Sequence, residues 1–276
     1  MKKRIKKVLF LLVVFAVLLP SLTQAQTIVK VAVVGDSNDP IWEIVQENLG
    51  DEIQIELVSF SDGVYANRAL SDGDLDLTAF QHNAFLEQET ADKGYEFEVI
   101  ADTYLSPMNV FSENISDLSE LQDGDTILIP NNVTNRGRAL KVLESAGVIK
   151  LDPDKGHLPE VIDIIENPLN LDIVETDPAI IPQALPDAAA GITNSDLAID
   201  FGIDPVQDAI FAIEIDPEEE ALQPYINIIV ARAEDKDNEV YQQIVEAYQQ
   251  PNVADFISEH FGNSIIPVFE GASAES

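Results

Sequence analysis

Residues 28–60 read IVKVAVVGDSNDPIWEIVQENLGDEIQIELVSF, and this stretch decides the fold class. Residues 28–34 are almost all apolar and residues 53–60 alternate in part, so both predict strands. Between them, residues 40–49 form an apolar-periodic run that opens with Pro40, the pattern of a helix with proline in its first turn. A strand, a helix and a strand in succession are typical of a largely parallel sheet in an α/β fold.

The same alternation of strand and helix patterns continues along the chain. Further strands are predicted at residues 75–80, 97–105, near 110, 126–130, 173–175, 189–193 and 225–231. Further helices are predicted at residues 84–93, 134–146, 180–185, 239–249 and 253–261. No internal repeat interrupts this pattern, and about 250 residues lie at the upper edge of one domain, so two lobes fit the length.

A polar turn joins the predicted strand at residues 126–130 to a helix that Thr134 is predicted to cap. A helix start presents unpaired N–H groups and partial positive charge, so it favours an anion. Arg138 follows one turn later, and its planar fork can grip a carboxylate at about 1.5–3 kcal/mol per charged hydrogen bond. A lone helix arginine is more often exposed. With only 15 basic residues in the chain, both interpretations of Arg138 stay open.

Residues 79–86, AFQHNAFL, place aromatic rings and an imidazole at the end of an apolar run. Phe80 and Phe85 taken singly are typical core residues, and His82 taken singly is typical of a structural hydrogen-bonding histidine. Together with the arginine and amides of residues 129–140, they indicate a pocket with an apolar end and a carboxylate-binding end. That combination suits an amino acid.

The charge of the chain excludes some partners. It carries 50 acidic and 15 basic residues, a formal net charge of −35, and such a field repels nucleic acid and anionic membranes. A solvated acidic surface suited to high salt explains this composition, and specific cation binding is the alternative. The chain has no cysteine, which rules out disulfides, zinc–thiolate sites and thiol catalysis.

An exported hydrolase is a weaker hypothesis. Neither Gly-x-Ser-x-Gly nor His-Glu-x-x-His occurs in the sequence, and with 50 acidic residues neighbouring carboxylates arise by chance. A metal receptor is weaker too, because His82, His157 and His260 are far apart and lack ligand spacing. We therefore expect no catalysis, no metal and no cofactor, while weak calcium association by surface carboxylates stays open.

Residues 1–25 have the pattern of a signal peptide. Five basic residues precede an apolar run at residues 8–19, which is too short to span a bilayer, and a cleavage-like site ends at Ala25. We expect export and removal of this segment, with an uncleaved anchor as the alternative. None of the 50 acidic residues lies in it, so the exported chain is still more acidic.

Several blocks of sequence resemble the methionine-binding lipoproteins of ABC importers, a group of periplasmic-type binding proteins. The blocks are residues 75–82, 118–124, 130–138, 147–151, 166–168 and 224–227. They keep their order across most of the chain, which makes the resemblance far more specific than one motif.

The resemblance implies a two-lobed fold with the ligand in the cleft between the lobes. Residues 27–106 with 224–276 would form lobe 1, and residues 107–223 would form lobe 2, with crossings near Ser106 and Gln223. The implied function is that of an extracytoplasmic receptor, which binds L-methionine or a related amino acid and delivers it to a membrane permease and its ATPase.

The resemblance also assigns roles to residues. Arg138 would hold the ligand carboxylate, while Asn135, Asn194 and Asn227 would hydrogen-bond its carboxylate or ammonium group.

The apolar end of the implied pocket would consist of Phe80, His82 and Phe85. There a thioether meets aromatic edges, a contact of about 0.3–1.5 kcal/mol. Tyr65 would add to this aromatic wall.

The sequence departs from the family pattern at three points. Residues 60–63 read FSDG where the family often has a tyrosine in the fourth place, and Tyr65 follows two positions later. Ser106 stands where some relatives carry an aromatic residue. Another amino acid, a short peptide or a different small ligand therefore remains the alternative to methionine. The lipid-attachment cysteine is also missing, so we expect a periplasmic or cell-surface location without that anchor.

Overall fold

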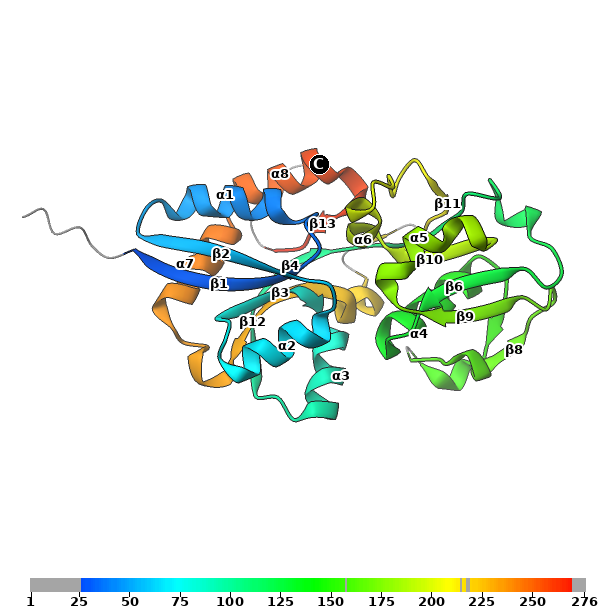
Figure 1. Cartoon of the computed structure of the whole chain (residues 1–276), viewed down its shortest axis with the longest axis horizontal. Helices are drawn as coiled ribbons and strands as arrows, with labels where there is room; N and C mark the ends of the chain where they lie inside the picture. Colours follow the sequence, from blue (N-terminus) through cyan, green and yellow to red (C-terminus); the bar gives the residue numbers. More distant parts are fainter. Residues whose placement is uncertain (1–25, 157, 214, 217–218, 270–276) are drawn as a thin grey trace, which may run out of the picture.

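The structure is a computed structural model that describes residues 26–156, 158–213, 215–216 and 219–269. The predicted signal peptide at residues 1–25 lies outside the described residues. Figure 1 shows two α/β lobes side by side, each built around its own sheet. The predicted two-lobed α/β class is therefore confirmed. None of the helices in the described ranges is long and apolar enough to cross a membrane.

Lobe 1 holds a six-stranded sheet in the order β13-β4-β12-β3-β1-β2. Its strands are β1 (Thr27–Val34), β2 (Ile53–Phe60), β3 (Leu77–His82), β4 (Phe97–Leu105), β12 (Ile226–Arg232) and β13 (Ile266–Pro267). Its helices are α1 (Asp39–Leu49), α2 (Gly63–Asp72), α3 (Asn83–Lys93), α7 (Glu239–Tyr248) and α8 (Pro251–Phe261).

The strands of lobe 1 do not all run in the predicted direction. β1 is parallel to β2 and β3, whereas β12 lies between β3 and β4 and is antiparallel to both. The sheet is thus mixed, although the four strands of residues 27–105 run in the same direction, as the sequence predicted. The reason is that β12 comes back from lobe 2 instead of following a crossover helix over the sheet.

Both faces of the lobe 1 sheet are covered, which explains why β1 is apolar almost throughout. Val31 and Val33 pack into the core that α1, α7 and α8 build, where the rings of Trp42 and Tyr248 meet edge to face at 5.3 Å. Ala32 points to the other face and packs toward α2.

Lobe 2 holds a five-stranded sheet in the order β11-β5-β10-β6-β9. Its strands are β5 (Met108–Phe111), β6 (Thr126–Pro130), β9 (Asp172–Thr176), β10 (Ala190–Asn194) and β11 (Ala209–Phe211), with a separate pair β7 (Lys150–Leu151) and β8 (Ile164–Glu166). Its helices are α4 (Val133–Ser145), α5 (Ile181–Ala184) and α6 (Ser195–Asp200).

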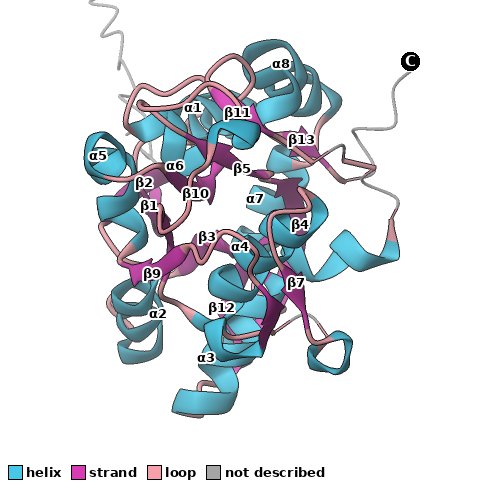
Figure 2. Cartoon of the chain, turned by 90° about the vertical axis from the view of Figure 1, so that its right-hand side faces the viewer, coloured by secondary structure: helices cyan, strands magenta, loops and turns pink. Residues whose placement is uncertain are grey.

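Two helices sandwich the lobe 2 sheet, as the end-on view of this lobe in Figure 2 shows. Ile127 and Ile129 of β6 pack with Leu140 of α4 on one face. Leu128, between them, packs with Ile181 of α5 on the other face. The short strand β6 is therefore buried on both sides, in keeping with its unbroken apolar sequence.

The chain leaves the first sheet at Leu105, enters the second at Met108 and rejoins the first at Ile226. Ile226 and Leu105 are register partners. The point where the chain leaves lobe 1 therefore lies beside the point where it returns. The lobe boundaries at Ser106 and Gln223 stay a prediction.

Candidate functional site

A cavity of about 270 Å³ lies between the lobes. Lobe 1 contributes the end of β3, the start of α2 and the start of β12, and lobe 2 contributes the loops that follow β6, β9 and β10. These are mostly the carboxyl ends of strands, the usual place for ligands in α/β sheets. Of the predicted residues, the cavity is lined by Phe80, His82, Phe85, Asn135, Asn194 and Asn227.

The aromatic side of the cavity comes from β3 and the first turn of α3. The rings of Phe80 and Phe85 meet edge to face, with centroids 6.1 Å apart. The His82 ring meets Phe85 at 6.3 Å and Tyr225 at 5.6 Å, also edge to face. The structure thus brings the three predicted residues of the apolar end together and adds Tyr225 beside them.

His82 is a neutral hydrogen-bonding residue at the boundary between the lobes. Its Nδ1 accepts the backbone N–H of Phe85 at 3.1 Å and caps α3. Nε2 therefore carries the proton and donates to Oδ1 of Asn135, in lobe 2, at 3.1 Å. Burial, and then the charge of Arg138, lower the pKa of His82 to about 3. The imidazole is thus both a cap and a contact between the lobes.

The start of α4 differs from the prediction in one residue. Asn132, not Thr134, is the N-cap, and its side chain accepts the backbone N–H of Asn135 at 3.0 Å. The N-cap therefore lies two residues before the predicted one, because the amide of Asn132 reaches the third helical N–H as an N-cap should. The first turn, with Asn135, still faces the cavity.

Arg138 lies behind the cavity wall. Only 7% of the residue is exposed. Its Nη2 donates to the Ser106 carbonyl at 2.5 Å, and its guanidinium carbon lies 4.8 Å from the centre of the Tyr225 ring. Burial lowers the pKa of the guanidinium to about 10, so it stays charged at neutral pH. In the described part of the chain, Nη1 has no hydrogen-bond partner. A buried charged donor with a free hydrogen is expensive unless a ligand meets it.

Tyr65 is not brought to the cavity. It lies on α2, is 62% exposed and is not among the lining residues. Gly63 lines the cavity instead. In an α-helix, residues two apart point to different sides, so the tyrosine two positions later cannot replace a side chain at 63.

Sequence reasoning missed the acidic part of the lining. Asp62, Asp177, Asp196 and Asp200 all line the cavity. Asp62, Asp177 and Asp196 follow β2, β9 and β10 within two residues, so the rule that ligands gather at the carboxyl ends of strands could have found them. No lysine or arginine lines the cavity in the part of the chain that the structure describes.

All four carboxylates accept hydrogen bonds, and for two of them the partners are distant in sequence. Asp196 accepts from the Ser106 hydroxyl at 3.0 Å, and burial raises its pKa. Asp200 bridges the lobes, because one of its oxygens accepts the N–H groups of Asp36 at 3.0 Å and Ser37 at 2.7 Å. Burial also raises the pKa of Asp200.

No group of three or more histidine, cysteine or acidic side chains in the described ranges is arranged to hold a metal ion. His82 lies in the cavity wall, whereas His260 stacks on Phe256 in α8. His157 lies outside the described residues.

The sequence of the chain matches that of a known protein family. The profile of the family described as NlpA lipoprotein matches residues 29–269. The D-methionine-binding lipoprotein MetQ of Escherichia coli K12 is 38% identical over 242 residues, which cover 86% of this chain and 87% of that protein.

Solved structures agree. A crystal structure of the methionine-binding protein MetQ superposes with a TM-score of 0.82 at 37% identity, over 88% of this chain and 98% of that one. A nutrient-binding protein from Burkholderia cenocepacia bound to methionine gives a TM-score of 0.81 at 35% identity, over 87% of this chain and all of that one.

Proposed function

The chain belongs to the NlpA lipoprotein family, and we propose that it is the substrate-binding protein of an ABC importer that binds methionine. The observation that carries this is the interlobe cavity, which has an aromatic end and a buried arginine nearby with an unpaired donor. The similar protein from Burkholderia cenocepacia is bound to methionine. The function is binding and delivery rather than catalysis.

We assign the two ends of the ligand by charge. The methionine carboxylate meets Nη1 of Arg138, with Asn135 beside it, because a charged donor already stripped of water binds an anion strongly. The ammonium group faces the lining carboxylates, among which the charge of Asp196 interacts with that of Arg138. Asn194 and Asn227 complete the polar shell.

The thioether of the ligand lies among Phe80, His82 and Phe85. A neutral imidazole suits this end, because a charged one would repel the ammonium group and need its own counter-ion. The low pKa of His82 keeps the ring neutral throughout the physiological range.

Closure of the lobes couples binding to delivery. His82–Asn135 and Asp200–Ser37 join the lobes, and ligand between the lobes adds contacts that only the closed form makes. We propose that a membrane permease and its ATPase recognise this closed form. We also propose that the protein acts outside the cytoplasm, in the periplasm or at the cell surface.

Calorimetric titration tests the function. The mature protein is unfolded, stripped of carried-over ligand, refolded and titrated with L-methionine, D-methionine and other amino acids at low and high salt. We expect one-to-one binding of methionine with a sub-micromolar Kd. Folded protein, as judged by circular dichroism, that gives no heat with either enantiomer would refute the methionine assignment, and a response to another amino acid or a short peptide would replace it.

A further inference from the structure

Helix α6 follows a strand of lobe 2 but contacts both lobes, and Figure 1 shows it at the boundary between them. Its residue Ala198 is fully buried in lobe 2, beside Phe111. The next residue, Ile199, packs against the apolar core of lobe 1. The helix ends at Asp200, whose carboxylate reaches the loop between β1 and α1 in lobe 1. The end of α6 therefore loses contacts with lobe 1 when the lobes separate.

The loop of lobe 1 presents two donors to one oxygen of Asp200. That oxygen accepts the backbone N–H of Asp36 at 3.0 Å and that of Ser37 at 2.7 Å. Both N–H groups lie just before the start of α1, where the helix dipole favours a negative charge. Among the residues that the structure describes, no ion pair between side chains joins the lobes. The carboxylate of Asp200 thus brings a charge-assisted contact to the boundary between the lobes.

Gly35 makes room for this contact. Its φ of +72° lies in the left-handed region that favours glycine. A Cβ atom at residue 35 would overlap Oδ2 and Cγ of Asp200, so a side chain there would push the carboxylate away from the two N–H groups. Asp200 lines the ligand cavity, whereas Gly35 does not. A substitution at residue 35 therefore disturbs the contact between the lobes without removing a group that faces the ligand.

We propose that the contact of Asp200 with the N–H groups of Asp36 and Ser37, which we call the latch, holds the lobes closed around the ligand. Gly35 is the residue that lets it form. Because the latch exists only where the lobes meet, it stabilises the closed form and slows the escape of the ligand. Asp200 is thus a positioning residue for the proposed function. The inference rests on that function for the identity of the ligand, but not for the contact between the lobes.

The first test measures how long methionine stays bound, by chasing radiolabelled methionine with an excess of the unlabelled amino acid. In Asp200→Ala, we expect the dissociation rate to rise about tenfold. The association rate, obtained with the Kd from calorimetry, should change less than about threefold, because the latch forms after the ligand has entered. Asp200→Asn keeps an oxygen that accepts both N–H groups, so its dissociation rate should rise less. Asp172→Asn, on the exposed side of β9, removes the same charge elsewhere in lobe 2 and should dissociate like the wild type.

Gly35→Ala should speed dissociation by a similar factor, because the added methyl group displaces the carboxylate. In the double variant G35A/D200A the two effects should not multiply, since alanine at residue 200 has no carboxylate to displace. Multiplied effects, or a wild-type dissociation rate in Asp200→Ala, would overturn the proposal. Thermal unfolding of each variant distinguishes a lost fold from a lost latch.

The second test measures closure itself. The chain has no cysteine, so Ser71→Cys on α2 and Ile180→Cys after β9, both exposed, take two spin labels whose separation double electron–electron resonance reports. In samples with and without methionine, Asp200→Ala should lower the ratio of closed to open protein about tenfold. The same distances in the variant and the wild type, in both samples, would refute the latch. A shift in the variant with no methionine binding by the wild type would refute the proposed function alone.

Discussion

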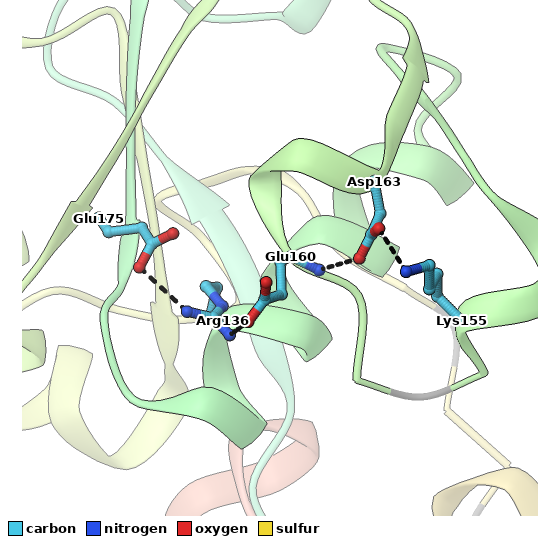
Figure 3. Close-up of polar contacts among 5 residues, drawn as sticks. All are labelled: Arg136, Lys155, Glu160, Asp163 and Glu175. Atoms are coloured by element: carbon cyan, nitrogen blue, oxygen red, sulfur yellow. Dashed lines mark hydrogen bonds and ion pairs between the residues drawn. The ribbon is translucent and has the colours of Figure 1, made fainter.

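The two sides of helix α4 use arginine in opposite ways. Arg136, whose side chain is 12% exposed, forms ion pairs with Glu160 at 2.8 Å and Glu175 at 3.2 Å, as Figure 3 shows. Arg138, two residues later, is buried against the Ser106 carbonyl and the Tyr225 ring, and one of its terminal nitrogens has no partner among the described residues.

Arg136 is therefore a structural cation, whereas Arg138 is available to a ligand. The charge of Arg136 is already matched by two fixed carboxylates, so a ligand carboxylate would gain little there. Arg138 loses its hydration when the protein folds, so binding does not bear that free-energy cost again. Its unpaired donor is left to interact with an incoming anion. Four predictions test this contrast.

Removing Arg138 should have the largest effect. Arg138→Ala should weaken methionine binding about 100-fold, because the charged hydrogen bond from Nη1 to the carboxylate is lost. Titration calorimetry measures the loss, and circular dichroism should show an intact fold. Arg138→Lys keeps the charge but not the planar guanidinium, so its affinity for methionine should fall between those of the wild type and the alanine variant. Unchanged affinity in the alanine variant would remove Arg138 from the site.

The acid stability of the protein should depend on His82, which Arg138 helps to keep neutral. The pKa of His82 is about 3 in the folded protein, against 6.5 for an ordinary histidine, so the unfolded chain takes up the proton first. This contribution to stability is complete above about pH 6.5 and is lost by about 1.4 kcal/mol per pH unit as the pH falls toward 3.

His82→Asn tests this point, since asparagine can still cap α3 but does not titrate. Urea unfolding between pH 4 and 8 should give a shallower acid decline for the variant than for the wild type. Parallel curves would show that His82 has the same pKa in the folded and the unfolded chain.

Replacing Arg136 should affect stability and leave binding alone. Arg136→Gln removes two ion pairs that are partly exposed, so we expect a loss of about 1 kcal/mol in the free energy of unfolding. The affinity for methionine should stay within about twofold of the wild type, because no contact with the cavity changes. A large loss of affinity here would erase the contrast between the two sides of α4.

The smallest effect is expected at Glu160, which is 58% exposed in its pair with Arg136. Glu160→Gln should cost about 0.5 kcal/mol or less, and the cost should shrink as salt is added, since exposed ion pairs are screened. Glu160 also donates its backbone N–H to Asp163, which pairs with Lys155 (Figure 3), and these contacts remain in the variant. A loss that does not depend on salt would point to packing instead of charge.

Long periodic segments were the part of the fold that the sequence could predict. The strand at residues 97–105 matches β4 end to end, and the helix at residues 239–249 matches α7 to within one residue. Helix α2 was missed, because it begins with glycine and buries a polar residue, Asn67, beside Ala66 and Leu70. The two-residue strand β13 is too short to show any periodicity.

The site was predictable where a residue stands at the end of a strand, as His82 and Asn194 do. It was not predictable where side-chain direction decides, as for Tyr65, because only the helix phase of α2 reveals that this ring faces solvent. Asp200 was hidden for another reason. Its partners, Asp36 and Ser37, are more than 160 residues earlier in the chain, and no local pattern signals such a contact.

The position of β12 sets the order in which the two lobes can be completed. The strands of the second sheet all lie within residues 108–211, so every contact that defines it is available before β12 exists. The first sheet stays divided between β3 and β4 until residues 226–232 arrive to join them. Contacts between distant segments form late because a long loop must close first. A chain that emerges N-terminus first therefore finishes lobe 2 early, and its N-terminal lobe matures last.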